Sequence, residues 1–153
     1  MARSGASAED DVAALAARLR RLEDLEEIRR LYLDYGHHLD HGDFAAFASL
    51  FAVDAKLRLS PRSRADGRAE VERVMTDNLG SRDHSSVIHV LGSPRIELDD
   101  DRATGEAMWS VVVRRDDGSP MLTMVGHHAD DLVREDGRWR FQRRRGFLDI
   151  PAT

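Results

Sequence analysis

The sequence predicts an α+β domain, because a helical pattern fills its first half and an alternating pattern fills its second half. Apolar residues recur at spacings of three and four in the first 80 residues, as in amphipathic helices. From residue 85 onward, turn residues such as Asp136-Gly137 separate apolar segments of strand length. We therefore expect a curved antiparallel sheet, a cone-shaped half barrel, covered by three N-terminal helices that enclose a pocket.

The longest predicted helix covers residues 9–41. Its first turns are rich in Ala, Leu, Arg and Glu, which favour helices, and we expect this part to project beyond the domain and pack on a partner subunit. The apolar stripe is formed by Leu15, Leu19, Leu22, Leu25, Ile28, Tyr32, Tyr35 and Leu39.

Two shorter helices are expected next. Gly42 ends the long helix, and Asp43 is placed to cap the second one. A third helix is predicted over residues 68–79, closed by Gly80. The stripe of the second helix is formed by Phe44, Phe47, Leu50 and Phe51.

Strand patterns fill the remainder of the chain. Leu57 and Leu59 alternate with charged residues and predict a short strand, followed by a polar loop over residues 61–67. Turn residues then delimit later strands near residues 86–91, 94–99, 102–115, 120–135 and 138–149.

Length and composition fit one globular domain. The chain has 153 residues and 41% hydrophobic residues, so we expect a single domain over residues 9–150 after a disordered segment at residues 1–8. A net charge of -5 argues against a nucleic-acid partner. There is no cysteine, which excludes disulfides and thiol nucleophiles. Neither a signal peptide nor a membrane span is evident, so we expect a cytoplasmic protein.

The stretch from Tyr35 to Asp54 holds the first candidates for chemistry. Asp40 lies where one helix stops and another starts, a place from which a side chain can face a cavity. His37 and His41 are one helical turn apart and, with His38, raise the alternative of a metal site. No further ligands are obvious in the sequence, so we expect no metal and no other cofactor.

Strand alternation supplies the other candidates. His89 shares a strand face with Val87 and Leu91, among apolar residues. His128 and Asp130 share a face with Met124, whereas His127 lies on the opposite face. Alternation alone leaves open which face is the inner one.

These residues, in this order, resemble the SnoaL-like superfamily of cone-shaped α+β barrels. The resemblance covers roughly residues 20–150 and rests on the order and spacing of several weak motifs together. Its elements are Leu25 to Tyr32, Tyr35, Asp40, Asp43, Phe51 to Ala55, His89, Gly126 to Asp130 and Asp136 to Phe141.

The resemblance implies an acid-base site. Lyases of this superfamily, such as scytalone dehydratase, hexachlorocyclohexane dehydrochlorinase and bile-acid 7α-dehydratase, pair an aspartate at the end of the first helix with a strand histidine. Asp40 and His89 match these two positions. Tyr35 matches a tyrosine of the bile-acid enzyme and Arg144 an arginine of the dehydrochlorinase. His128 stands where many relatives have tyrosine, so the substrates of those enzymes are not carried over.

The chemistry has its own physical basis. A carboxylate that accepts one ring N–H of a histidine fixes its tautomer and stabilises the imidazolium, which makes the other nitrogen a better base. His89, oriented by Asp40, would then remove a C–H proton beside a carbonyl or leaving group. Tyr35 would donate a proton and Arg144 would offset negative charge. The expected substrate pocket is lined by His128, Trp109, Phe51 and Met124.

Each assignment has a structural alternative. Asp40 is equally a helix-end residue, His89 a core histidine and Tyr35 part of the core stripe. Arg144 lies opposite Trp139 under strict alternation, so it reaches the cavity only if a bulge shifts the register. Asp130 fits a structural hydrogen bond better than a catalytic role.

Two functions follow from the sequence. The first is a cofactor-independent lyase or isomerase (a dehydratase, dehydrohalogenase or double-bond isomerase) acting on a small hydrophobic, cyclic substrate. The alternative is a non-catalytic ligand-binding or assembly module of the same fold, like the small subunits of ring-hydroxylating dioxygenases. We also expect a homodimer or homotrimer, because the outer face of the sheet, with the apolar residues Trp109, Val111 and Val113, would otherwise be exposed to water.

Overall fold

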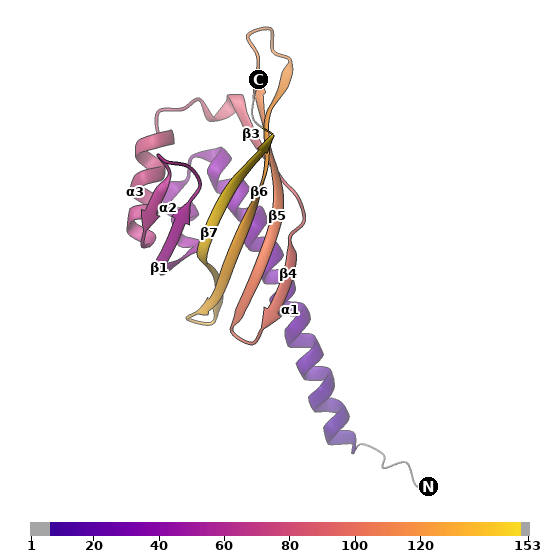
Figure 1. Ribbon diagram of the computed structural model, residues 1–153. Helices are drawn as coiled ribbons and strands as arrows, with labels where there is room; N and C mark the ends of the chain where they lie inside the picture. The colour runs from indigo at the N-terminus through magenta and orange to yellow at the C-terminus, as the bar shows by residue number, and fades with distance from the viewer. Residues whose placement is uncertain (1–6, 151–153) are drawn as a thin grey trace.

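The computed structural model describes residues 7–150, which form three α-helices, one 3-10 helix and seven strands (Figure 1). No helix within these residues has the length and apolar character needed to cross a membrane. The elements are α1 (Ala8–His41), α2 (Phe44–Ser49), β1 (Phe51–Arg58), β2 (Arg64–Asp66), α3 (Arg68–Leu79), η1 (His84–Ser86), β3 (Val87–Leu91), β4 (Arg95–Asp99), β5 (Arg102–Arg114), β6 (Pro120–Glu135) and β7 (Arg138–Ile150).

Helix α1 begins and ends at well-defined caps. The Ser7 hydroxyl accepts the N–H of Asp10 at 3.2 Å, and Gly42 closes the helix with a left-handed φ of 69°. Disorder was expected for residues 1–8. Residues 1–6 lie outside the described part, and Ser7 and Ala8 form the cap and the first residue of the helix. The N-terminal half of α1 projects from the domain, as expected (Figure 1).

The second and third helices follow the sequence signals with one correction. The Asp43 side chain accepts the N–H of Ala46 at 3.0 Å and caps α2, and α3 ends before Gly80 as predicted. Phe51 was assigned to the stripe of the second helix, but it is the first residue of β1. Its carbonyl oxygen accepts a hydrogen bond from Arg68, which ties the start of β1 to α3. The expected loop over residues 61–67 contains the short strand β2.

The seven strands form one large curved, unclosed sheet in the order β2-β1-β7-β6-β5-β3, with β4 also pairing with β5. Every pairing is antiparallel except β1 with β7, which is parallel, so the sheet is mixed. This parallel pair exists because α2 reverses the chain and returns β1 to the sheet beside the last strand (Figure 1). The cone-like α+β architecture predicted from the sequence is confirmed.

Two of the sheet's register shifts bear on which side chains face the helices. One falls between Val111 and Val112 on β5, opposite β6. The other falls between Asp131 and Leu132 on β6, opposite β7, and it turns Arg144 to the same side as Phe141. Arg144 is therefore fully buried inside the sheet.

The outer face of the sheet differs from the expected one. Trp109, Val111 and Val113 were assigned to it, but Val111 is only 4% exposed, and all three pair with inner-face residues of β3. The assignment is wrong because strand alternation defines two faces without saying which one is covered. The exposed apolar residues of the outer face include Ile88, Val90, Met108 and Leu122.

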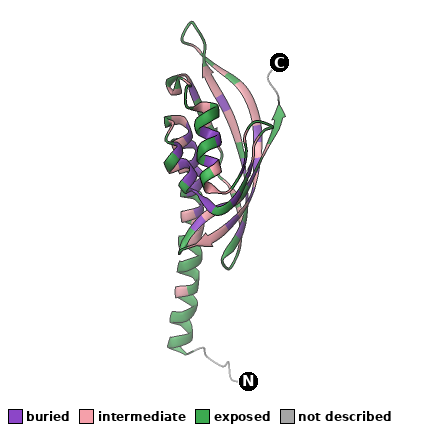
Figure 2. Ribbon diagram, turned by 90° about the vertical axis from the view of Figure 1, so that its left-hand side faces the viewer, coloured by how far each residue is buried: buried purple, intermediate pink, exposed green. Residues whose placement is uncertain are grey.

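The core lies between the three helices and the concave side of the sheet (Figure 2). From Ile28 onward α1 buries one stripe against the sheet, whereas its N-terminal half is almost entirely exposed. The largest buried apolar side chains of this core are Ile28, Tyr32, Tyr35, Phe47, Phe51, Leu57, Leu132, Trp139 and Phe141.

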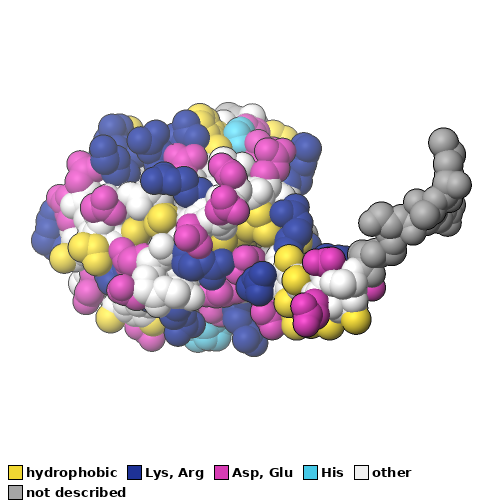
Figure 3. Space-filling view, turned by 90° about the horizontal axis from the view of Figure 1, so that it is seen from below, with side chains coloured by type: hydrophobic (Ala, Val, Ile, Leu, Met, Phe, Trp, Pro, Cys, Tyr) yellow, Lys and Arg dark blue, Asp and Glu magenta, His cyan; other side chains and the backbone are white. Residues whose placement is uncertain are grey.

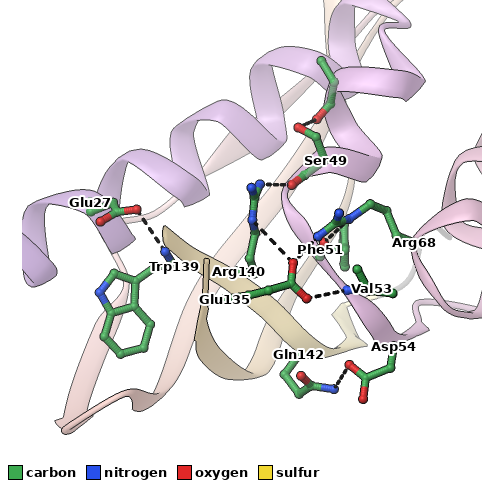
Figure 4. A network of polar contacts seen from close by, with 11 residues as sticks. Glu27, Ser49, Phe51, Val53, Asp54, Arg68, Glu135, Trp139, Arg140 and Gln142 are labelled. Atoms are coloured by element: carbon green, nitrogen blue, oxygen red, sulfur yellow. Dashed lines mark hydrogen bonds and ion pairs between the residues drawn. The ribbon is translucent and has the colours of Figure 1, made fainter. Parts of the chain in front are cut away.

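A polar network fixes the β6–β7 hairpin to the helices (Figure 4). The Glu135 carboxylate accepts the backbone N–H of Val53 at 2.8 Å and also binds Arg68. The backbone N–H of Trp139 donates to Glu27 on α1 at 2.9 Å. These contacts tie the turn between β6 and β7 to β1, α3 and α1.

Candidate active site

Asp40 and His89 meet at the junction of α1 and β3. Asp40 lies in the last turn of α1, just before the Gly42 cap, and His89 is the central residue of β3. The Asp40 carboxylate is 2.6 Å from Nδ1 of His89. Each side chain is 17% exposed, so the pair is largely enclosed but still reached by solvent.

The backbone reinforces this contact. The N–H of His89 donates to both carboxylate oxygens of Asp40, at 3.1 and 3.0 Å. Carboxylate oxygens accept hydrogen bonds, so in this contact Nδ1 of His89 donates to Asp40 and Nε2 is not engaged. The carboxylate is thus fixed by three hydrogen bonds, and it presents a histidine in the tautomer needed for a base at Nε2.

Arg144 lies deeper, in a buried ion pair with Asp130. Its Nε and Nη2 donate to the two Asp130 oxygens at 2.9 and 2.6 Å, and both side chains are 0% exposed. The Tyr32 hydroxyl also donates to Asp130, at 2.6 Å. The expected structural hydrogen bond of Asp130 is therefore present. Burial raises the pKa of Tyr32 and the negative charge of Asp130 adds to it, so Tyr32 remains a donor.

Tyr35 packs at the centre of the same interior. Its ring lies 4.1 Å from the Arg144 guanidinium carbon and 5.5 Å from the ring centre of His128. Burial raises the pKa of the Tyr35 hydroxyl, although the Arg144 charge acts in the opposite direction. Tyr35 therefore stays protonated at neutral pH, where it can act as an acid or a hydrogen-bonding group but not as a base.

His128 and Trp109 line the inner face between the two pairs. Their rings are 5.8 Å apart, and the indole lies against Gly126, where a side chain would collide with it. The pKa of His128 lies well below its usual value, chiefly because burial disfavours the imidazolium, and also because Arg144 and His89 bring positive charge near it. Within residues 7–150, Nδ1 of His128, Nε1 of Trp109 and Nη1 of Arg144 are buried without a hydrogen-bond partner.

The remaining predicted pocket residues lie in different surroundings. Phe51 is 0% exposed and packs against Phe47 and Phe141 in the core, and Met124 is partly exposed on β6. Hollows of about 850 and 590 Å³ lie beside β4, and neither is lined by Asp40 or His89. The rings of Phe47, Phe51 and Phe141 surround Tyr35, and the Asp40–His89 pair has an exposed edge.

The histidines at the end of α1 stay close to their own helix. Nδ1 of His41 lies 2.7 Å from the carbonyl oxygen of His37, to which it donates, and the two rings are 4.2 Å apart. In the described part of the chain, no three His, Cys, Asp or Glu side chains are grouped so that they could hold a metal ion.

Tyr32 is the residue that sequence reasoning missed. Its hydroxyl contacts Asp130, 98 positions later, and no local pattern links the two. The only signal was a second tyrosine one turn before Tyr35, on the stripe that faces the sheet.

Comparison with known proteins agrees with this architecture. The SnoaL-like domain model matches residues 20–145, and no curated protein matches the chain. An NTF2-like protein with a cystatin-like fold from Novosphingobium aromaticivorans is 30% identical, with a TM-score of 0.81 over 92% of this chain and 91% of that one.

Two further structures from the same organism share the fold at lower identity. A candidate scytalone dehydratase is 23% identical, with a TM-score of 0.71 over 85% of this chain and 87% of that one. The β subunit of a candidate aromatic-ring-hydroxylating dioxygenase is 18% identical, with a TM-score of 0.71 over 86% and 92% of the respective chains. On the domain match and the 30% relative, this chain belongs to the SnoaL-like family.

Proposed function

We propose that this protein is a cofactor-independent lyase or isomerase in which His89 is the general base and Asp40 orients it. The observation that carries the proposal is the 2.6 Å contact between the Asp40 carboxylate and Nδ1 of His89, which leaves Nε2 available. Nε2 takes a proton from a carbon next to a carbonyl group. The electrons of the broken C–H bond then form an enolate.

The enolate has two outcomes. In a lyase it re-forms the carbonyl and expels a hydroxyl or halide from the neighbouring carbon, which leaves a C=C bond. In an isomerase the substrate carries a C=C bond next to the carbon that loses the proton, and the enolate is conjugated with it. His89 then returns the proton to the far carbon, the C=C bond shifts by one position and the carbonyl re-forms. Both outcomes balance within the substrate and these side chains, and neither needs an oxidant. Tyr35 serves as the proton donor, and the positive charge of Arg144 stabilises the anionic intermediate from within.

The inner lining also supports a substrate class. Trp109 Nε1 and Arg144 Nη1 are donors only, and both are buried without partners in the described chain. Around them lie the rings of Tyr35 and His128. Such an interior fits a small hydrophobic, cyclic molecule that carries an oxygen acceptor, because the acceptor would satisfy a donor that is otherwise unpaired.

Proton abstraction can be tested without knowing the natural substrate. The probes are β-hydroxy- and β-chlorocyclohexanones in D₂O, followed by proton NMR for elimination and for exchange of the C–H beside the carbonyl. The wild-type protein should accelerate elimination or exchange for part of this panel. His89→Ala should lower the rate by about 10²–10⁴-fold, and Asp40→Asn should lower it as well, because the carboxylate that stabilises the imidazolium is lost.

The chain offers a matched control on its outer face. His127 contacts Asp149 through Nδ1 at 2.8 Å, so His127→Ala removes the same residue type from the same kind of pair. This variant should keep the wild-type rate. Folded His89→Ala and Asp40→Asn proteins that turn over a probe as fast as wild type would rule out the proposed base.

A second candidate function is a non-catalytic binding or assembly module. It is favoured by the tight aromatic packing around Tyr35 and by hollows that lie away from Asp40 and His89. If this alternative holds, the cyclohexanone probes either bind without turnover or do not bind. His89→Ala then changes neither the binding nor the rate of turnover.

A further inference from the structure

The N-terminal segment of α1, residues 8–23, stands apart from the domain. Within the described chain, the first side chain of α1 bonded to the sheet is Asp24, which accepts from Arg134 at 2.5 Å and from Nε1 of Trp139 at 3.1 Å. An open hollow of about 850 Å³ separates Ala17 and Arg20 from Leu98 of β4. At about 1.5 Å per residue, the segment extends on the order of 24 Å beyond its anchor.

This segment carries an exposed apolar seam, defined as Val12, Leu15, Leu19 and Leu22. The four side chains are 66%, 62%, 56% and 63% exposed. Their spacing of three, four and three residues is that of the a and d positions of a heptad repeat. Figure 3 shows hydrophobic side chains among charged ones at the surface of this projecting helix.

The seam points away from the chain's own sheet. With 3.6 residues per turn, its centre lies roughly 160° around the helix from the stripe that α1 buries farther along. That stripe includes Ile28, Leu31 and Tyr35. A second helix can therefore lie along the seam without meeting the sheet of the first chain. Because the domain already holds α1 in helical form from Asp24 onward, pairing does not have to nucleate a new helix.

The charges beside the seam select the partner and its direction. In a parallel, in-register pair of identical helices, Arg18 at position g lies opposite Glu23 at position e of the other copy, and symmetry repeats the contact. The antiparallel pairing that joins Val12 to Leu22 would instead place Arg18 against Arg18 and Glu9 against Glu23. Like charges oppose that arrangement. We infer that a second copy of this chain docks on the seam to form a parallel, two-stranded coiled coil.

Cysteine cross-linking tests the direction of pairing, since the natural chain has no cysteine. In the parallel dimer, Leu22→Cys places two thiols side by side, and mild oxidation should convert most of the protein to a covalent dimer on a non-reducing gel. Ala13→Cys is the matched control, because it is exposed on the same segment but faces away from the seam. It should remain mainly monomeric on the gel.

The opposite direction gives a different pattern. An antiparallel pair would cross-link a mixture of Val12→Cys and Leu22→Cys chains and leave Leu22→Cys alone uncross-linked. That pattern, or equal cross-linking of Ala13→Cys and Leu22→Cys, would overturn the inference.

Light scattering of the natural chain tests the seam without oxidation. The wild-type mass at micromolar concentration should be that of a dimer, and Leu19→Lys should halve it while leaving the circular dichroism spectrum of the domain unchanged. Arg18→Glu should weaken the dimer about fivefold, because two exposed ion pairs of about 0.5 kcal/mol each are lost. Arg18→Glu combined with Glu23→Arg should restore it. A monomeric or trimeric wild type, or a dimer unaffected by Leu19→Lys, contradicts the proposal.

Discussion

Asp130 and Asp40 each hold a basic side chain at the inner face of the sheet, but at different depths. The Asp130 carboxylate is 2.6 Å from Nη2 of Arg144, and both side chains are 0% exposed. The Asp40 carboxylate is also 2.6 Å from its partner, Nδ1 of His89, and these side chains are each 17% exposed. Distance is therefore the same in the two pairs, and enclosure is what differs.

The two pairs also differ in the chemistry that their basic side chains can perform. Asp130 is bonded by Arg144 and Tyr32, and it joins β6, β7 and α1 where water does not reach. Arginine does not release its proton in a protein, so this pair cannot exchange protons with a substrate. An imidazole ring, in contrast, can both accept and release a proton, and Nε2 of His89 is not used by Asp40. The proposed proton transfer therefore uses the pair with an exposed edge.

The largest effect expected from this comparison is on stability. Arg144→Met leaves the Asp130 charge buried without its partner, so we expect the free energy of unfolding to fall by about 3–5 kcal/mol. Urea denaturation followed by circular dichroism measures it.

The matching control replaces the whole cluster. Asp130→Leu, Arg144→Met and Tyr32→Phe together remove every charge and polar partner, and this triple variant should be more stable than Arg144→Met alone. If Arg144→Met lowers the free energy of unfolding by less than about 1 kcal/mol, burial does not determine the strength of the Asp130–Arg144 pair.

Much of the fold follows from local sequence signals. The caps at Gly42 and Asp43 set the helix junction, and turn residues such as Asp136-Gly137, with φ of 51° and 75°, set the strand ends. These signals act within a few residues, so one sequence is enough to detect them.

The candidate site depends on longer distances along the chain. Asp40 and His89 are 49 positions apart, and only the family resemblance predicted that they meet. The inner face of β5 was misassigned. The face on which Arg144 lies depends on a β-bulge, and no residue type in the sequence marks where such a bulge occurs. Tyr32 was missed for a related reason, since its partner lies on a distant strand.

The second prediction concerns the Asp40 pair. Asp40→Ala removes the acceptor for the backbone N–H and the ring of His89, so the free energy of unfolding should fall by about 1–3 kcal/mol. This cost is smaller than that of Arg144→Met because water can reach the exposed edge and replace part of the bonding. Urea denaturation compares the two variants directly, and an equal or larger cost for Asp40→Ala would reverse the proposed order of enclosure.

His128 lies between the two pairs and gives a third prediction, on pH. Its pKa in the folded protein lies well below the usual value, so the unfolded chain binds a proton first as the pH falls. The contribution of neutral His128 to the free energy of unfolding is fully present above about pH 6.5. Below that pH it should fall by about 1.4 kcal/mol per pH unit. His128→Gln lacks this proton site and should lose less stability between pH 6.5 and 5 in urea titrations. Parallel pH profiles for the two proteins would place His128 in a solvated environment.

The smallest effect is expected for a third pair, His127 with Asp149, on the outer face. The contact is 2.8 Å, close to that of Asp40 with His89, but the side chains are 29% and 39% exposed. Water and dissolved ions screen such a pair, so His127→Ala should change the free energy of unfolding by less than about 0.5 kcal/mol, apart from the stacking of its ring on Phe147. Phe147→Leu measured beside it isolates the stacking contribution. If the His127–Asp149 pair contributes as much to the free energy of unfolding as the Asp40–His89 pair, then contact distance, and not burial, sets the strength of His–Asp pairs in this sheet.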